Sequence, residues 1–234
     1  MTEQLFSEDP YLRGCEARVM AVGTDGIEFD RTVFYPMGGG QPGDSGLLCR
    51  ADGTRIPILD TRHGDGVRIL HRLAGDAALP QVGETVTVEL DWARRYAHMR
   101  MHTCLHLLGS VLRYGVTGGS VGTERSRLDF DMRDGVDREH VDACLNDLVK
   151  GDHAVRTFWI TQKELDQRPD LIRTLSVRPP PGAGRIRLLE IAGVDLQPCG
   201  GTHVARTGEI GPVRLGKIEK KGAHNRRVYV ELAG

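Results

Sequence analysis

Four side chains with the chemistry of metal ligands lie in two short motifs. The first motif is HTCLH, in which His102 and His106 are four residues apart. On an α-helix this spacing places both imidazoles on one face, where they can share a metal ion. The second motif is CGGTH, in which two glycines let Cys199 and His203 turn toward one point. Together the nitrogen and sulfur donors predict a Zn²⁺ site.

The same helix leaves another ligand pair open. His98 lies on the stripe that contains His102 and His106, and the rise from residue 98 to residue 106 is about 12 Å, too long for one ion to bind both ends. The spacing therefore allows either the 98/102 or the 102/106 pair. Cys104 lies about 200° around the helix from His102 and is expected to be a core thiol.

The motifs also restrict the class of zinc protein. Thr103 stands where HExxH metalloproteases carry their glutamate base, and the H-x-E…P-C-x-x-C signature of zinc deaminases is absent. A complete set of four protein ligands is typical of a structural zinc, because a catalytic zinc keeps one position open. The ligand set thus predicts a metal more firmly than it predicts catalysis.

A glycine-rich segment, FYPMGGGQPGDSG, covers residues 34–46. It has neither the GK[ST] ending of a P-loop nor a GxGxxG pattern. Its consecutive glycines Gly38, Gly39 and Gly40 lack Cβ atoms, so a ligand or another backbone can approach closely. Gln41 adds an amide with donors and an acceptor. The alternative is an unusual turn that binds nothing.

The elements that must position these residues fall into two parts. Residues 1–90 read as a glycine-rich domain of short strands, which favours a small β-barrel or sandwich. A turn at residues 24–26 separates the first two strands. The expected strands cover residues 15–22, 27–35, 55–61, 67–73 and 84–90.

Residues 91–234 read as an α+β domain, so the fold class is α+β with a barrel-like domain first. A helix over 92–114 begins at Asp91, and a second one over 137–151 is opened by Asp137 and closed by Gly151. Residues 179–184, PPPGAG, read as a loop. Residues 121–132 read as a strand pair or a bent strand, and further strands are expected at residues 155–160, 185–191 and 213–230.

Composition and charge limit the possible binding partners and the cellular compartment of the protein. The net charge of −1 excludes a globally basic nucleic-acid binder, but residues 206–227 carry seven Lys and Arg against two Glu, a stripe that could hold phosphates. The alternative is a solvated edge strand protected by its charges. Five scattered cysteines indicate a reducing compartment. The N-terminal residues lack the pattern of a signal peptide, so a cytoplasmic location is expected.

The order TVFYPMGGGQPGDSG, HTCLH, CGGTH resembles the editing module of alanyl-tRNA synthetase. It is more similar still to the free-standing alanyl-tRNA editing proteins of the AlaX family, of the medium-length type. Residues 127–131, 186–188 and 207–212 fit as well, so the resemblance covers nearly the whole chain. It implies hydrolysis of the ester that joins a wrong amino acid to alanine tRNA, with serine as the first candidate and glycine as the second.

The resemblance also implies roles for individual residues. It makes His102, His106, Cys199 and His203 the ligands of one zinc ion per chain, which selects the 102/106 pair. It places Thr32 and Gln41 at the catalytic site, where Thr32 is expected to read the serine hydroxyl, and Gly38–Gly40 beside the substrate. Two departures are Met37, where relatives often have a polar residue, and Cys104, where alanine is common.

Transfer RNA is the expected partner, read through its backbone and unpaired end. No membrane and no stable protein partner are implied, and a monomer or weak dimer is expected. Two alternatives are a structural-zinc tRNA-binding module without catalysis and a metal-dependent hydrolase of a small ester or amide. The expected tRNA contacts are Arg94, Arg95, Arg100, Lys217, Lys220, Lys221, Arg226 and Arg227.

Overall fold

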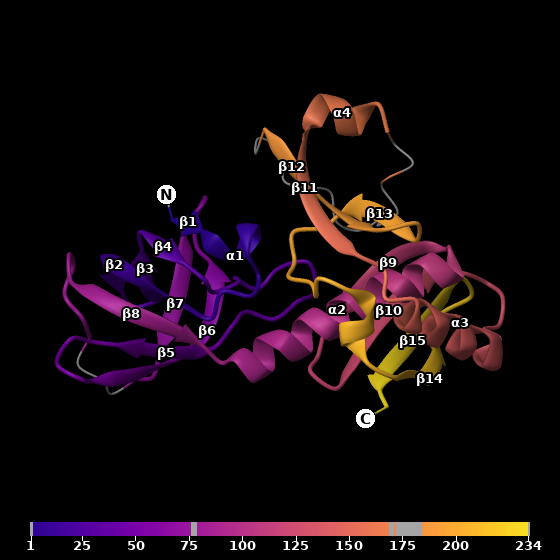
Figure 1. The fold of residues 1–234 in the computed structure, drawn as a ribbon, viewed down its shortest axis with the longest axis horizontal. Coiled ribbons are helices and arrows are strands. Elements are labelled where there is room, and N and C mark those ends of the chain that lie inside the picture. The colour runs from indigo at the N-terminus through magenta and orange to yellow at the C-terminus, as the bar shows by residue number, and fades with distance from the viewer. Residues whose placement is uncertain (1, 76–78, 169–170, 172–183, 234) are drawn as a thin grey trace. The chain divides into compact units, whose positions relative to one another are not determined.

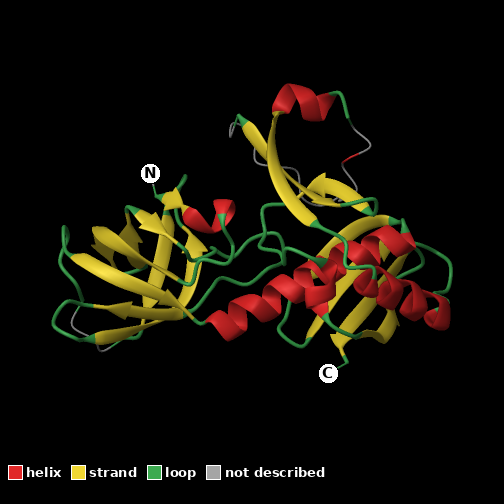
Figure 2. Ribbon diagram, viewed as in Figure 1, coloured by secondary structure: helices red, strands yellow, loops and turns green. Residues whose placement is uncertain are grey.

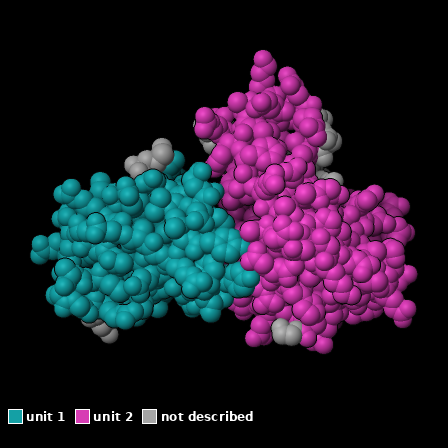
Figure 3. All heavy atoms as spheres, viewed as in Figure 1, with its two compact units in different colours: residues 1–96 teal, residues 97–234 magenta. Residues whose placement is uncertain are grey.

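The computed structural model describes residues 2–75, 79–168, 171 and 184–233 (Figure 1). Their contacts divide the chain into two compact units, Met1–Tyr96 and Ala97–Gly234 (Figure 3). The boundary between the units lies within helix α2 (Trp92–Leu112), a few residues after the predicted boundary at residue 90. Unit 1 is built mainly of strands, whereas unit 2 mixes helices and strands (Figure 2).

Six strands of unit 1 form a closed barrel in the order β2-β3-β7-β6-β5-β8, which confirms the predicted barrel-like fold. Alternate side chains fill its interior, among them Val19, Phe29, Leu48, Ile56 and Val88, as the two-residue period of a strand requires. The strands are β2 (Gly14–Gly23), β3 (Gly26–Phe29), β5 (Gly46–Cys49), β6 (Arg55–His63), β7 (Ile69–Leu73) and β8 (Thr85–Leu90).

The β2–β3 hairpin turns where it was predicted, because Gly23 pairs with Gly26 across the turn. The strand predicted over residues 27–35 is wrong in its second half. Asp30 interrupts it, since its carboxylate accepts a hydrogen bond from the Arg18 backbone N–H at 2.7 Å. The next residues form β4 (Arg31–Thr32), which pairs in parallel with β1 (Glu3–Gln4); helix α1 (Leu5–Glu8) follows β1.

Two longer helices, α2 and α3, supply the helical part of unit 2, and α2 begins in unit 1. Asp91 caps α2 by accepting a hydrogen bond from the Arg94 N–H at 3.1 Å. Asp137 caps α3 (Arg138–Lys150) in the same way through the His140 N–H, and Gly151 ends it, so both predicted helices are confirmed. Helix α3 packs against β14 (Val213–Lys220) and the short 3-10 helix η2 (Thr207–Ile210).

Two antiparallel sheets complete unit 2. The larger has the order β14-β15-β10-β9, with β9 (Gly115–Ser120), β10 (Arg125–Asp131) and β15 (Asn225–Leu232); the strand predicted over 213–230 is therefore a hairpin. The smaller has the order β11-β12-β13, with β11 (Val155–Thr161), β12 (Arg185–Ile191) and β13 (Asp195–Pro198). Helix α4 (Gln162–Asp166) follows β11, and its Leu165 joins Leu188 in a small core.

Two further findings bear on the predictions. The predicted loop over residues 179–184 lies, except for Gly184, outside the described residues. Among the described helices, none is both long enough and apolar enough to cross a membrane.

Candidate metal centre

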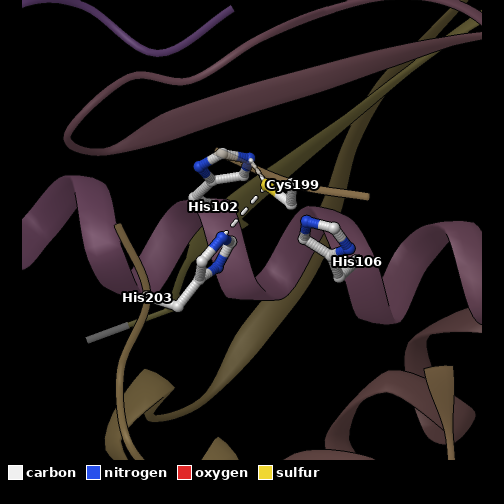
Figure 4. Close-up of side chains that lie close together, drawn as sticks. All are labelled: His102, His106, Cys199 and His203. Carbon is white, nitrogen blue, oxygen red and sulfur yellow. Dashed lines mark hydrogen bonds between the residues drawn. The ribbon is translucent and has the colours of Figure 1, made fainter. Parts of the chain in front are cut away.

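The two ligand motifs converge in unit 2. His102 and His106 project from one face of α2, and Cys199 and His203 approach them from the segment after β13 (Figure 4). One ligand atom from each residue lies within 4.8 Å of all the others. His98 is buried on the same helix but outside this cluster, so the pair that converges is 102/106.

The spacing of the cluster fits a tetrahedral metal ion. Cys199 Sγ lies 3.6 Å from His102 Nε2 and 3.2 Å from His203 Nε2. Metal–sulfur and metal–nitrogen bonds of zinc length place two such atoms about 3.6 Å apart at a tetrahedral angle. The three histidines are buried, whereas Cys199 is half-buried. These four residues could therefore hold one metal ion, with Cys199 on the more open side.

Buried hydrogen bonds orient two of the imidazoles. The Oδ2 atom of Asp195 lies 3.1 Å from His106 Nδ1, and the side-chain amide of Gln197 lies 2.9 Å from the same nitrogen. Both contacts engage Nδ1 and leave Nε2 for the cluster. Thr103 Oγ1 donates to the Met99 carbonyl at 2.9 Å, so it accepts from His203 Nδ1 at 3.2 Å. Thr103 is the residue whose type excluded a metalloprotease, and its hydroxyl supports a ligand instead.

Arg187 on β12 holds the CGGTH segment. Its Nη1 donates to the Gly201 carbonyl at 2.6 Å and to the Cys199 carbonyl at 3.3 Å, and its own carbonyl accepts from the Cys199 N–H at 3.1 Å. These bonds stabilise a backbone that glycines alone would leave free to move. The sequence carried no spacing signal for Arg187 or Asp195, because both act from strands outside the two motifs.

The electrostatics of the cluster favour a thiolate. Burial raises the pKa of Cys199, but His102, His203 and His106 together lower it to well below 9. Burial lowers the pKa of His203 to about 3. Although burial also acts to lower the pKa of His106, the charges of Cys199 and Asp195 raise it to about 9. The site thus attracts positive charge, which a bound cation would supply in place of that proton.

Cys104 does not belong to the cluster. It is fully buried, and burial raises its pKa to about 12, so the expected core thiol is confirmed. The direction of its side chain follows from the helix geometry, since residues two positions apart point to opposite sides.

Thr32 lies in unit 1, where its hydroxyl is already engaged. Its Oγ1 accepts from the Phe34 N–H at 3.0 Å and lies 2.9 Å from His71 Nε2. His71 Nδ1 lies 3.1 Å from the Ile27 carbonyl and donates to it, so Nε2 accepts the Thr32 proton. Both residues are fully buried. Sequence reasoning missed His71, because it lies 39 residues away from Thr32 along the chain.

In the glycine-rich segment, the close backbone approach does not occur at the three consecutive glycines, where it was predicted. Gly39 and Gly40 have φ values of +56° and +84° in an exposed turn, in which the Gly38 and Gln41 backbones bond to each other at 2.9 and 3.1 Å. The close backbone approach occurs further on, because a Cβ on Gly43 would lie 2.0 Å from the Thr61 carbonyl oxygen. The Gln41 side chain is buried.

Two of the predicted tRNA contacts have their guanidinium groups bonded within the protein. Arg95 is fully buried and forms an ion pair with Asp44, with a further bond to the Val33 carbonyl, so the prediction that it binds tRNA on the surface is wrong. Arg100 donates through Nε and Nη2 to the Ile210 carbonyl at 2.9 and 2.6 Å. The buried guanidinium of Arg95 must be paired, whereas Arg100 is half-buried.

The basic stripe is partly neutralised. Lys217 and Lys221 flank Glu219 at 2.7 and 2.6 Å, and Arg227 makes a forked contact with Asp129 at 2.8 and 2.9 Å. Arg226 donates to the Arg133 carbonyl at 2.6 Å. Lys217, Lys220 and Lys221 remain exposed, whereas Arg94, Arg226 and Arg227 are half-buried.

Comparison with known proteins adds relatives over nearly the whole length. The AlaX-M alanyl-tRNA editing protein of Methanosarcina mazei is 36% identical over 99% of this chain and 97% of its own length. The AlaX-M protein of Saccharolobus solfataricus is 34% identical over 98% of each chain. An alanine–tRNA ligase from Korarchaeum cryptofilum is 36% identical over 94% of this chain, which spans 25% of that ligase.

Two family models match the two units separately. Residues 12–94 match a model of class II (A) tRNA synthetases. Residues 186–229 match the second additional domain of threonyl and alanyl tRNA synthetases, and this match includes Cys199 and His203.

Proposed function

Because the chain belongs to the AlaX-M alanyl-tRNA editing proteins, we propose that it is an aminoacyl-tRNA deacylase that edits mischarged alanine tRNA in trans. The observation that carries this proposal is the similarity over 99% of the chain, together with the convergence of the four predicted ligands in unit 2. The reaction is hydrolysis of the ester at the tRNA 3′ end, with water as the nucleophile. We place it in the cytoplasm, where charged tRNA is used.

The proposed substrate is alanine tRNA that carries serine, with glycine as the second candidate. Serine differs from alanine by one hydroxyl, and a site that binds this hydroxyl leaves a polar group unpaired when alanine enters. Thr32 is the proposed reader of that hydroxyl. Its bonds to His71 and Phe34 use its proton and one lone pair, and the remaining lone pair can accept a hydrogen bond from serine.

Zinc is the ion that we propose for the cluster, because imidazole and thiolate donors favour zinc over harder cations that prefer oxygen. When bound, zinc would supply positive charge that orients the substrate or a water molecule. The chain's own residues hold the ligands in place, since Asp195 orients His106 and Thr103 orients His203. Arg187 in turn fixes the backbone of the cysteine ligand.

An aminoacyl ester is already activated, so positioning and electrostatic stabilisation account for much of the required rate. The exposed lysines Lys217, Lys220 and Lys221 are the strongest candidates for phosphate contacts. Arg94, Arg226 and Arg227 remain secondary candidates because they are half-buried.

One observation favours a second function. The cluster offers four protein ligands, and such a closed set is typical of a structural zinc. The second candidate is therefore a tRNA-binding module whose zinc only stabilises the fold. It predicts that bound tRNA is never deacylated.

The experiment that separates the two functions is a deacylation assay with the zinc-loaded protein. Alanine tRNA charged with serine, glycine or alanine is incubated with the protein, and ester loss is followed. We expect loss of serine with retention of alanine. Retention of all three by a folded, metal-loaded protein that binds tRNA would establish the binding module instead. Serine ester turnover without tRNA would favour a hydrolase of small esters.

A further inference from the structure

Strand β11 exposes two large aromatic side chains. It lies at the edge of the β11-β12-β13 sheet (Figure 1), and its residues Phe158 and Trp159 are 40% and 44% exposed. Neighbouring residues on a strand point to opposite faces of the sheet. The two aromatic rings therefore face different surroundings, and only one of them can face the metal centre.

The strand register decides which ring that is. Phe158 pairs with Leu188, a member of the small core with Leu165, so Phe158 belongs to the face that packs on α4. Trp159 pairs with Arg187 on β12. From that second face, Arg187 reaches the carbonyls of Cys199 and Gly201.

The pairing of β11 with β12 extends, through Arg187, to the segment that carries Cys199. Trp159 lies opposite Arg187, and the Arg187 carbonyl accepts the N–H of Cys199, directly after the end of β13. Two strand spacings of about 4.8 Å place the backbones of Trp159 and Cys199 roughly 10 Å apart. The residue that carries the exposed indole thus lies about the length of one nucleoside from the residue that carries the thiol ligand.

The charge of this face suits an RNA end. Arg185 pairs with Thr161, so it shares a face with Trp159 and Arg187, and it is exposed. An unpaired base offers a π-face for an aromatic ring, and the phosphate next to it offers a negative charge for a guanidinium. The exposed indole and the neighbouring guanidinium therefore fit an unpaired base and its adjacent phosphate.

We propose that Trp159 stacks on the terminal adenine at the unpaired 3′ end of tRNA and so holds the attached aminoacyl ester over the metal centre. This inference rests on the proposed function, because the ester lies on the ribose of that same adenosine. Arg185 would contact the last phosphate. The base is bound on β11 and β12, while the amino acid enters the ligand cluster.

Fluorescence tests the stacking without any reaction. The chain has two tryptophans, and Trp92 lies in unit 1, stacked on Tyr96, so Trp92→Phe leaves Trp159 as the sole reporter. This variant is titrated with an uncharged acceptor-stem RNA that ends in CCA and with the same RNA ending in CC. We expect quenching by the first RNA and at least a fivefold weaker response to the second, within the range of one base–aromatic stack.

Kinetics test the role in the reaction. Trp159→Ala should raise KM for serine-charged tRNA about tenfold, with kcat changed less than threefold, as expected for the loss of one stack. Trp159→Phe should stay within threefold of the parent protein because it keeps a π-face. Phe158→Ala is the matched control on the opposite face and should leave KM unchanged.

The outcomes are distinguishable from a failure of the proposed function. Equal quenching by both RNAs, or a Trp159→Ala variant with the parent KM, would overturn the stacking role. So would a dimer that Trp159→Ala converts to a monomer, since Trp159 would then lie in a protein interface. A parent protein that is quenched by the CCA end but hydrolyses no ester would support the stack and contradict the deacylase.

Discussion

The metal cluster and the Thr32–His71 pair are both buried polar groups built around histidine, but the ring nitrogens of their histidines have different partners. Both ring nitrogens of His71 are used inside the barrel, by the Ile27 carbonyl and the Thr32 hydroxyl. In the cluster, the outer nitrogens of His106 and His203 are bonded to Asp195 and Thr103. Their inner nitrogens converge with His102 on one thiol.

This difference separates a structural histidine from a ligand. A buried imidazole that satisfies both nitrogens with protein partners is complete, and burial lowers the pKa of His71 to about 4. In the cluster the thiolate and Asp195 raise the pKa of His106 to about 9, so this site attracts positive charge that a cation can supply in place of the proton. Whether a buried histidine can bind a metal therefore depends on where each ring nitrogen points, and residue type alone does not reveal this.

The largest test of this contrast removes a ligand from the cluster. Cys199→Ala should reduce the metal content from one ion per chain to nearly none, and deacylation of serine-charged tRNA should fall at least a hundredfold. Three imidazoles without the thiolate lose the charge that attracts the cation. The control is Cys144→Ser in the same unit, a thiol outside the cluster. Metal analysis and the tRNA assay measure both effects, and a metal-loaded, active Cys199→Ala protein would contradict the assignment.

The second test uses pH on the barrel. The pKa of His71 is lower in the folded protein, about 4, than its ordinary 6.5, so the unfolded chain binds more protons between these values. Its contribution to stability is complete above pH 6.5 and is lost as the pH falls toward 4. We expect that the loss of unfolding free energy between pH 7 and 4.5 is about 2.5 kcal/mol larger in the parent than in His71→Gln.

Urea titrations of the two metal-loaded proteins at several pH values measure this difference. Taking the difference between the proteins cancels the titration of groups that the substitution leaves in place. Parallel pH curves would show that His71 titrates alike in both states.

The third test addresses the support of the ligands. Thr103→Val removes the acceptor of His203 Nδ1 and of the Val204 N–H, and should weaken metal binding by about 10- to 100-fold. Thr103→Ser keeps the hydroxyl and should restore most of the affinity. Competition with a chelator measures both constants. Equal affinity of the valine and serine variants would show that the hydroxyl does not orient His203.

The smallest expected effect on activity comes from Thr32 in the barrel. Thr32→Val leaves the Phe34 N–H and His71 Nε2 without the partner that each now has, which should cost about 1–3 kcal/mol of stability. It should also narrow the ratio of serine to alanine hydrolysis about tenfold, the worth of one hydrogen bond. Thr32→Ser is the control that retains the hydroxyl. A lower stability with an unchanged ratio would confine Thr32 to the barrel.

Local signals predicted much of the fold. The caps at Asp91 and Asp137 and the turn before Gly26 depend on neighbouring residues, and all three are found. The strand predicted through residue 35 ended early because Asp30 accepts a bond from Arg18 on the adjacent strand. Such a contact joins distant residues, and no local pattern contains it.

The candidate site likewise contains residues that local spacing predicts and residues that depend on distant contacts. Helical spacing brought His102 and His106 to one face, and the glycines of CGGTH allowed Cys199 and His203 to turn together. Arg95 has the charge expected of an RNA contact, yet it is buried and forms an ion pair with Asp44, a residue of the glycine-rich segment. Charge in a sequence does not tell whether a side chain meets solvent.

By itself, the sequence determined which residue types could bind a metal and on which local elements they lie, since helical period, capping and glycine act over a few residues. Only the tertiary structure decided that Asp195, Thr103 and Arg187 orient the ligands, that His71 occupies the Thr32 hydroxyl, and that Trp159 lies opposite Arg187 in its sheet. These relations depend on strand register and on hydrogen bonds between distant segments, which form only when the chain has folded.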